Sequence, residues 1–371
     1  MKKLTNLLEW LVRAEDPRQQ AKVNHPMKDI IAIVFFATLA NAGECGEIYL
    51  FAVSNEKHLR KYLELPNGIP SHDTIQRVFA MVPSGFLQEF RERWDRIVSG
   101  SVGGKLRKIL ALDGKTQRGN GSAAQKANHI VSAVDGDGFC LGEALVDGKS
   151  NEVTAIPELL KSLDVRGHVV TIDAAGCQRD IAALIRRKGA HYVLALKGNQ
   201  GTLNTDVREY FGDPGLLAGC AYHRTVDKAR GAVEIREYWQ TADVSWLPQR
   251  KAWSGLASII MTRNTTVKDG VTKTDRRYFI GSLPLDVEEA ARAVRGHWMV
   301  ESCHWHLDVT FREDANRTLD RAAAYNHNIV RKMAINTLRI VDVGVAGISM
   351  KGKRYMISMD FGRYLDVLMA L

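Results

Sequence analysis

The feature that most constrains this chain is a short apolar run that leads directly into Asp113. Residues 108–116 read Lys-Ile-Leu-Ala-Leu-Asp-Gly-Lys-Thr, so charged residues and a glycine bound the apolar stretch. This pattern predicts a strand inside a sheet covered on both faces, with the strand ending at Asp113. Open α/β sheets bind their ligands at the carboxyl ends of such strands. An Asp in that place is more often a turn or cap residue, so other parts of the chain must support a functional role.

The composition allows a sizeable core and favours a polyanionic partner. The 371 residues suffice for one large domain or for two to three smaller ones, and 45% of them are hydrophobic. The formal net charge of +9 favours binding to nucleic acid, although a basic enzyme without such a partner fits the charge equally well. Five cysteines without a CxxC pair indicate a reducing compartment.

No stretch of the sequence predicts membrane insertion or export. The longest apolar run, residues 30–40, is shorter than the ~20 residues that span a bilayer. The amino terminus lacks the long apolar region and the small-residue cleavage site of a signal peptide. We therefore expect a cytoplasmic protein that associates with the nucleoid and has no membrane partner.

Residues 1–100 are predicted to form an all-helical amino-terminal domain. Residues 29–42 are mostly apolar over more than a usual strand length, which favours a buried helix. Ser71 and Ser84 are expected to cap two further helices. Along the second of these helices, apolar side chains recur on one face, and three cations lie away from it: Arg91, Arg93 and Arg96. These cations fit a solvated helix face better than phosphate contacts.

The pattern after residue 105 changes to alternating short strands and helices, which predicts an α/β sheet. Residues 168–173 repeat the opening theme, because a buried strand again leads into an aspartate, here Asp173. Residues 217–281 contain strands with few helical stretches between them, so we expect a β-rich insertion in the α/β domain.

A long helix is predicted after the insertion. It begins at Val287 and ends near Leu307, and Asp286 is its expected N-cap, with Glu289 completing a capping box. Glu301 lies on this helix. The chain is therefore predicted to have three parts: 1–100, 105–345 with its insertion at about 217–281, and a tail at 346–371.

Two strand-end aspartates and a helix glutamate fit a metal site for phosphodiester chemistry. Asp113, Asp173 and Glu301 supply the hard oxygen ligands that Mg²⁺ or Mn²⁺ prefers. Two such ions ~3.5–4 Å apart can activate a water or a 3′-hydroxyl and stabilise the leaving oxygen. Three cations near these carboxylates in sequence are candidate phosphate contacts, with ordinary surface positions as the alternative: Lys115, Arg118 and Lys197.

The residues around Glu301 leave another interpretation open. His297, His304 and Asp308 lie near the same helix face and could bind zinc, although the HExxH motif is absent. The two tryptophans of this stretch are expected in the core rather than as stacking platforms for bases: Trp298 and Trp305. A serine hydrolase finds no support, because the GxSxG motif is absent.

Ordered motifs along nearly the whole chain match one known family. They are Asp16-Pro17-Arg18, His25-Pro26-Met27, Gly68-Ile69-Pro70-Ser71-His72-Asp73-Thr74-Ile75, Leu112-Asp113-Gly114-Lys115-Thr116, Asn151-Glu152-Val153-Thr154-Ala155-Ile156-Pro157, Thr171-Ile172-Asp173-Ala174, Gly176-Cys177-Gln178, Leu196-Lys197-Gly198-Asn199-Gln200, His297-Trp298-Met299-Val300-Glu301, Leu307-Asp308-Val309 and Glu313-Asp314. With these motifs the chain resembles the H-repeat-associated insertion-sequence transposases (the ISAs group) of the DDE superfamily.

The resemblance implies a ribonuclease-H-like catalytic domain with a β-rich insertion, preceded by helices that help to bind the ends of the element. It also implies that Asp113, Asp173 and Glu301 form a catalytic triad that binds Mg²⁺ or Mn²⁺, as two ions. The reaction would be cleavage of double-stranded DNA at the element ends, followed by attack of the freed 3′-hydroxyl on target DNA. Arg236 and His297 join the predicted DNA contacts, and paired ends imply a homodimer.

One departure from the family pattern lies directly after the helix glutamate. Many members have one more residue between that glutamate and the His-Trp pair, whereas Ser302 and Cys303 lead from Glu301 straight to His304. One residue is ~100° of helix rotation, so the face after Glu301 cannot keep the family register without a bulge.

A second departure lies in the insertion, where Arg230-Gly231-Ala232 replaces the usual His-Gly-Arg, although Glu234 and Arg236 still match. Three functions therefore stay open: an active DDE transposase, an inactive remnant that only binds DNA, and a metal-dependent nuclease that acts on host DNA. Metal-dependent joining of 3′ ends separates the first from the third, and binding without cleavage selects the second.

Overall fold

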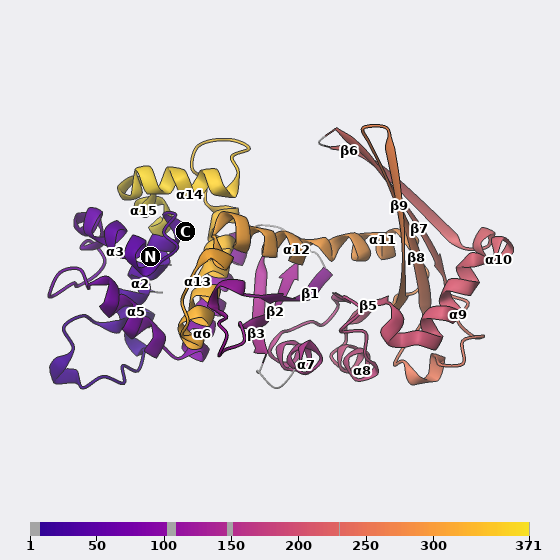
Figure 1. Ribbon diagram of the computed structural model, residues 1–371, viewed down its shortest axis with the longest axis horizontal. Coiled ribbons are helices and arrows are strands. Elements are labelled where there is room, and N and C mark those ends of the chain that lie inside the picture. The colour runs from indigo at the N-terminus through magenta and orange to yellow at the C-terminus, as the bar shows by residue number, and fades with distance from the viewer. Residues whose placement is uncertain (1–7, 102–108, 147–150, 230, 371) are drawn as a thin grey trace.

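One large mixed sheet organises the protein (Figure 1). The computed structural model describes residues 8–101, 109–146, 151–229 and 231–370. Within these residues the strand order is β3-β2-β1-β4-β5-β9-β8-β7-β6. The strands are β1 Ile109–Thr116, β2 His129–Asp135, β3 Cys140–Val146, β4 Val169–Ile172, β5 His191–Leu196, β6 Ala221–Ala229, β7 Ala232–Thr241, β8 Ser258–Lys268 and β9 Val271–Gly281.

The central strands are parallel and the outer strands are antiparallel. Strand β4 pairs in parallel with β1 on one side and β5 on the other, whereas β2, β3 and β9 join in antiparallel fashion. This mixed α/β arrangement is consistent with a ribonuclease-H-like domain, as predicted. The predicted insertion contains β6 to β9, which continue the same sheet and project as long hairpins at one end of the molecule (Figure 1).

Strand β1 continues past Asp113, so the prediction that it ends there is wrong. Its parallel pairing with β4 does stop at the pair Leu112↔Ile172. Its antiparallel pairing with β2 runs on to Thr116, because β2 is long enough to supply partners for these residues. Asp113 is therefore the first residue of β1 without a partner in β4.

Helices cover both faces of the sheet and form one end of the molecule. The helices α7 (Glu152–Ser162), α8 (Arg179–Arg187) and α9 (Gly201–Gly212) lie on one face, and α11 (Val287–Gly296) and α12 (Trp298–Trp305) cross the other (Figure 1). The remaining α-helices are α2 Met27–Leu39, α3 Cys45–Ser54, α4 Glu56–Leu59, α5 His72–Met81, α6 Ser84–Ser101, α10 Pro214–Ala218, α13 Arg321–Ile340, α14 Met350–Met359 and α15 Phe361–Ala370.

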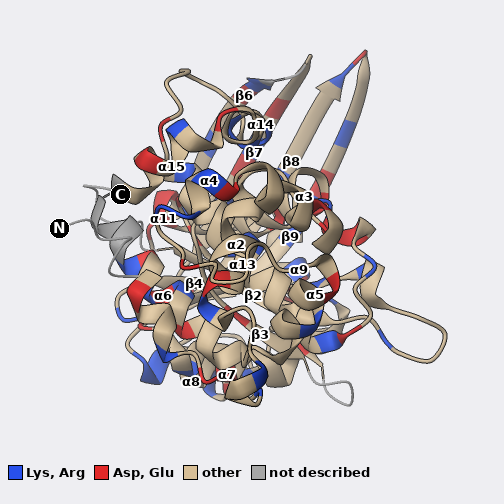
Figure 2. Ribbon diagram, turned by 90° about the vertical axis from the view of Figure 1, so that its left-hand side faces the viewer, with Lys and Arg blue, Asp and Glu red and all other residues tan. Residues whose placement is uncertain are grey.

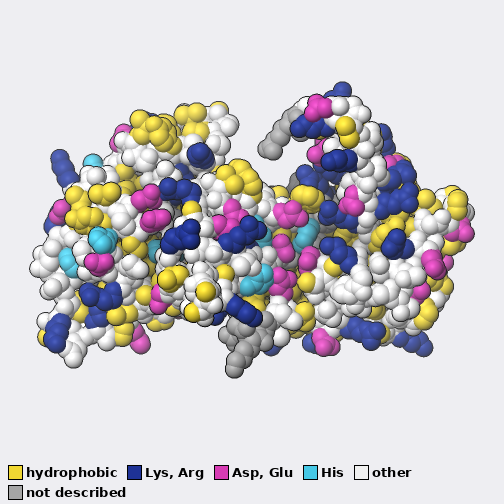
Figure 3. Space-filling model, viewed as in Figure 1, with side chains coloured by type: hydrophobic (Ala, Val, Ile, Leu, Met, Phe, Trp, Pro, Cys, Tyr) yellow, Lys and Arg dark blue, Asp and Glu magenta, His cyan; other side chains and the backbone are white. Residues whose placement is uncertain are grey.

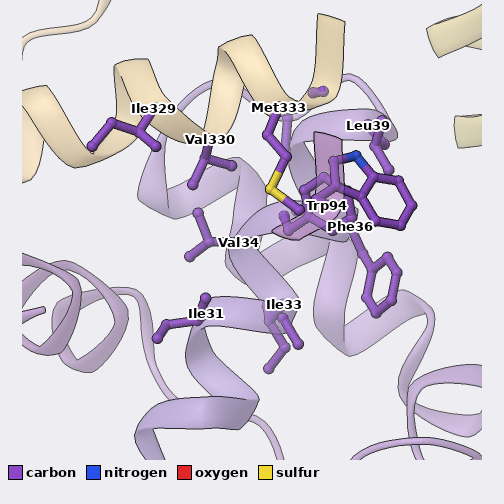
Figure 4. Packing of buried hydrophobic residues seen from close by; sticks show 14 of the residues in the cluster. Ile31, Ile33, Val34, Phe36, Leu39, Trp94, Ile329, Val330 and Met333 are labelled. Carbon is purple, nitrogen blue, oxygen red and sulfur yellow. The ribbon is translucent and has the colours of Figure 1, made fainter. Parts of the chain in front are cut away.

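The amino-terminal helices share one apolar core with the rest of the chain. Helix α2 is buried over nearly all of its surface, as the sequence predicted, and it packs against α3, α5 and α13. Figure 4 shows Phe36 and Val34 of α2 near Trp94 of α6 and Met333 of α13. The same core includes residues of β2 and of α15, so the predicted domain boundaries at 100 and 345 stay predictions.

Arg91 is buried, so its predicted place on a solvated helix face is wrong. Its guanidinium lies 2.7 Å from Asp95 and 3.3 Å from Glu143 on β3, and Lys332 lies 3.7 Å from the same glutamate. Glu143 and Lys332 have no exposed side-chain surface. Arg93 fits the prediction better, because it is partly exposed and pairs with the exposed Glu89 one turn earlier in α6.

The predicted single helix from Val287 to Leu307 is divided into two. Helix α11 ends at Gly296, α12 begins at Trp298, and a π-helical turn, η6, covers His306–Thr310. The predicted N-cap is confirmed, because the Asp286 carboxylate accepts the backbone N–H of Glu289 at 2.9 Å. Gly296 permits the break close to the sheet, since a Cβ there would lie 2.9 Å from a side-chain methyl of Ile109.

Lys and Arg positions alternate with Asp and Glu positions along the helices at the end of the molecule that faces the viewer in Figure 2. On the face seen in Figure 3, the surface is hollowed between this end and the projecting β-hairpins. No helix in the described part of the chain is long and apolar enough to cross a membrane.

The buried charges between α6, β3 and α13 lead to a test of stability. Glu143→Gln leaves Arg91 and Lys332 buried with less negative charge, so the free energy of unfolding should fall by about 3–5 kcal/mol in urea titrations. Glu89→Gln removes an exposed pair and should change it by less than about 1 kcal/mol. Equal small effects would mean that the buried pairs contribute no more than the surface pair.

Candidate active site

Asp113 and Asp173 lie side by side at the point where the parallel pairing of β1 and β4 ends. Because Leu112 pairs with Ile172 in parallel strands, the next residue on each strand, Asp113 and Asp173, emerges at the same level. The Asp173 carboxylate accepts the backbone N–H groups of Ala175 and Gly176 at 3.0 and 3.3 Å. These bonds fix the orientation of Asp173 toward the turn that follows β4.

The predicted third carboxylate lines the same cleft. Glu301 projects from α12, and it borders a cleft of about 520 Å³ together with Asp113 and Asp173. Strands β5, β8 and β9 and helix α11 form the rest of the wall. The structure therefore brings together the three acidic residues that the sequence predicted, although they come from positions almost 190 residues apart.

Burial and mutual repulsion perturb the acidic groups. Burial, together with the charge of Asp173, raises the pKa of Asp113 to about 7, and Glu152 and Glu301 add to the rise. Burial also raises the pKa of Glu301, which Arg277 and Arg295 oppose. Carboxylates that repel one another in this way favour a proton or a cation between them.

Two neutral histidines lie close to the aspartates: His297, which borders the acidic cleft, and His304. Burial lowers the pKa of His297, whose Nδ1 lies 3.1 Å from the Thr171 hydroxyl of β4. Burial, helped by nearby lysines, lowers the pKa of His304 to about 3, and its Nδ1 lies 3.6 Å from the Asp113 carboxylate. Neither histidine therefore neutralises the aspartates at pH 7.

A fourth carboxylate, which the sequence analysis did not single out, adjoins the triad. Glu152, the first residue of α7, lies 2.6 Å from His129 Nε2, and the Thr116 hydroxyl lies 2.8 Å from the other ring nitrogen. A Cβ at Gly114 would lie 2.1 Å from the Glu152 carboxylate. The glycine after Asp113 thus leaves room for this pair, and the Asn-Glu motif at the start of α7 was the signal that could have identified it.

The donor set suits a hard divalent cation. Within the described residues, no three His, Cys, Asp or Glu side chains converge closely enough to hold a metal ion. The chemistry of Asp113, Asp173 and Glu301 nevertheless fits Mg²⁺ or Mn²⁺, because all three offer carboxylate oxygens and their repulsion would be relieved by positive charge. The three residues of the alternative zinc site do not come together, because each contacts a different partner: His297, His304 and Asp308.

The five predicted DNA contacts occupy three different places. Lys197 is exposed after β5 and borders the acidic cleft, as does His297. Arg118 is highly exposed and lies 3.8 Å from Asp314. The other two are paired with carboxylates: Lys115 with Asp308, Glu313 and Asp314, and Arg236 of β7 with Asp227 and Glu234.

Both tryptophans of α12 are exposed, so the prediction that they lie in the core is wrong. Trp298 is 42% exposed and Trp305 is 55% exposed. The guanidinium groups of Arg277 and Arg295 lie 5.8 and 5.7 Å from the centre of the Trp298 ring. Trp298 and Glu301 also border a second cleft of about 840 Å³ between α12 and the β6–β7 hairpin.

The large mixed sheet with helices on both faces is consistent with a ribonuclease-H-like DDE domain. Residues 104–337 match the family described as "Transposase DDE domain", and residues 8–95 match the one described as "DDE_Tnp_1-associated". The chain therefore belongs to the DDE transposase family. Membership implies an activity of the polynucleotidyl-transferase type with DNA as the partner, and the family typically uses divalent metals.

Relatives along the whole chain carry transposase names. "Putative transposase YncI" of Escherichia coli O157:H7 is 35% identical over 364 residues, which are 95% of this chain and 92% of that protein. "H repeat-associated putative transposase YhhI" of E. coli K12 is 33% identical over 371 residues, with 96% and 97% covered. The resemblance found in the sequence motifs is thereby confirmed. "Inactive transposase YbfQ" of E. coli K12 is 36% identical, over 20% of this chain.

The contact between Glu152 and the site can be tested by titration. Glu152 raises the pKa of Asp113, so Glu152→Gln should lower that pKa from about 7 by no more than about one pH unit. A ¹³C NMR titration of labelled aspartate carboxylates, with the signal assigned from Asp113→Asn, measures the change. Glu158→Gln removes an exposed carboxylate from the same helix and serves as the control. An Asp113 pKa that is equal in both variants would contradict the contact.

Proposed function

We propose that this protein is an active DDE transposase that cleaves DNA at insertion-sequence ends and transfers the freed 3′-hydroxyl to target DNA. The observation that carries the proposal is the cleft bordered by Asp113, Asp173 and Glu301, in a chain that belongs to the DDE transposase family. The raised pKa of Asp113 supports it, because perturbed carboxylates gather where a site binds cations.

Asp113, Asp173 and Glu301 would hold the metal, as Mg²⁺ or Mn²⁺ and as two ions. The bound ions would activate the attacking water or 3′-hydroxyl and stabilise the leaving oxygen. The chain's own residues orient the carboxylates: backbone amides hold Asp173, and the Thr171 hydroxyl contacts His297 beneath the cleft. The neutral imidazoles leave the negative charge of the site for the metal.

DNA would reach this site across a partly cationic surface. Lys197 and His297 border the acidic cleft and are proposed to contact the strand that is cut. Arg118 is exposed at the end of β1 and is proposed to contact the backbone further along. Arg236 borders the second cleft, and its two carboxylate partners would have to yield to a phosphate. A homodimer that holds two ends completes the proposal.

The shortened stretch after Glu301 is the feature that favours the inactive remnant. The structure has a π-helical turn at His306–Thr310, where the backbone N–H of Phe311 bonds to the carbonyl of His306 at 3.0 Å. Glu301 lines the cleft in this arrangement. The cation that the insertion motif lacks falls at Ala232, the first residue of β7, and Gly231 before it adopts a positive φ of 75°.

Strand cleavage of DNA that carries the flanking inverted repeats tests the proposal. Nicking at the repeat boundary should require Mg²⁺ or Mn²⁺ and cease with a chelator. Asp113→Asn, Asp173→Asn and Glu301→Gln should each lower the cleavage rate at least 100-fold, because each removes a metal ligand. Binding to the ends should persist in all three, since the predicted DNA contacts are untouched.

Glu209→Gln on the exposed surface of α9 is the matched control and should leave cleavage unchanged. Binding without nicking by the wild-type protein under any metal would identify an inactive remnant. Cleavage without joining of 3′ ends would indicate a nuclease instead. Loss of end binding in Asp113→Asn and Asp173→Asn, with the fold intact, would contradict the roles assigned to these residues.

A further inference from the structure

Lys115 lies within a cluster of carboxylates rather than on an open surface. Its ammonium is 2.7 Å from Asp308, 3.1 Å from Glu313 and 3.2 Å from Asp314, and its side chain is only 10% exposed. These carboxylates hold the pKa of Lys115 above its usual value despite burial. A DNA phosphate would have to displace them, whereas Arg118, three residues away, is 84% exposed.

The contacts of Lys115 connect β1 to the segment that follows the Glu301 helix. Side chains alternate along a strand, so Asp113 and Lys115 lie on the same face of β1, about 6.7 Å apart. On the helical side, the junction between α12 and the π-helical turn η6 faces these two residues. His304 approaches Asp113 at 3.6 Å, and Asp308, four residues later, contacts Lys115.

The segment that includes His304 and Asp308 therefore contacts β1 at two points, Asp113 and Lys115. The first contact comes from α12 through His304 and the second from η6 through Asp308, so a shift of the segment by one residue relative to β1 would break both contacts. Neutral His304 forms no ion pair with Asp113. Among the described residues, Lys115 thus supplies the charged link of this strand to Asp308.

The far end of the same segment is anchored in the core. Glu313 is buried, and Arg331, at 3.3 Å, and Lys115 help to hold its pKa at about 2. Its carboxylate also accepts hydrogen bonds from Gln117 at 3.1 Å and Asn328 at 2.9 Å. Because Gln117 follows the end of β1 and Asn328 lies on α13, the segment 306–314 is fixed at its end and at Asp308.

We propose that Lys115 is a positioning residue of the active site: its ammonium fixes α12, and with it Glu301, in register with β1 and Asp113. This inference rests on the proposed function, because it assigns the spacing of two metal-binding carboxylates to an ion pair outside the cleft. Without the ammonium, Asp308, Glu313 and Asp314 repel one another and the segment moves from β1.

The test compares Lys115→Met, Lys115→Arg and the exposed cation variant Arg118→Met. Hydrogen exchange should be at least 10-fold faster in residues 298–310 of Lys115→Met, with no change in β6 to β9. Its Mn²⁺ affinity, measured by EPR of the bound ion, should fall at least 10-fold, and Lys115→Arg should recover most of it. Binding to DNA ends should keep the salt dependence of the wild type.

Arg118→Met should show the opposite result: unchanged Mn²⁺ affinity, and a slope of log affinity against log salt that is smaller by about 0.9. Lys115→Met behaving like Arg118→Met would make Lys115 a phosphate contact and overturn the proposal. Asn328→Ala weakens the Glu313 cluster but keeps the Asp308 contact. An equal loss of Mn²⁺ affinity in Asn328→Ala would indicate general destabilisation and also overturn it.

The exchange measurement separates this inference from the proposed function. If the wild-type protein bound no Mn²⁺, the metal-dependent function would fail. Faster exchange confined to residues 298–310 of Lys115→Met would still support the link between α12 and β1, and unchanged exchange there would overturn it.

Discussion

The repulsion between carboxylates at the end of the β1–β4 pairing is the constraint around which the structure is arranged. Parallel pairing stops at Leu112↔Ile172, so Asp113 and Asp173 emerge together and burial raises the pKa of the first. The surroundings do not neutralise this pair. Burial keeps the neighbouring histidines neutral, and the nearest arginines act mainly on Glu301. The site thus keeps a negative potential, which is what a hard cation and a phosphodiester reaction require.

The sequence predicted those features that depend on neighbours along the chain. The position of Asp173 directly after a buried strand, the N-cap at Asp286 and the helical amino-terminal segment follow from local patterns and are seen in the structure, whereas β1 runs on past Asp113. Arg91 was misplaced because Glu143, its partner, lies 52 residues away on β3. The same reason hid the surroundings of Lys115, whose partners Glu313 and Asp314 lie 198 and 199 residues further on.

The predicted long helix is interrupted where it packs against the sheet, and the periodicity of the sequence does not reveal this contact. Gly296 and His297 are compatible with a continuous helix, and no proline marks a break. The interruption follows Gly296, which lies against β1, since a Cβ there would be 2.9 Å from a methyl group of Ile109. His297 itself keeps helical φ and ψ values of −57° and −31°, and its ring contacts Thr171 of β4. Both tryptophans of α12 face solvent or a cleft, although the sequence analysis placed them in the core.

The shortened stretch after Glu301 has a different meaning once the contacts of α12 are known. Counting residues from the glutamate suggests that everything downstream is rotated by ~100°. The downstream residues are held independently, however, because Asp308 pairs with Lys115 and Glu313 is buried among its partners. The segment from His304 onward is thus fixed to β1, and any change in register falls on the glutamate end of α12. Glu301 borders the cleft with both aspartates, so the shortened stretch does not remove this carboxylate from the site.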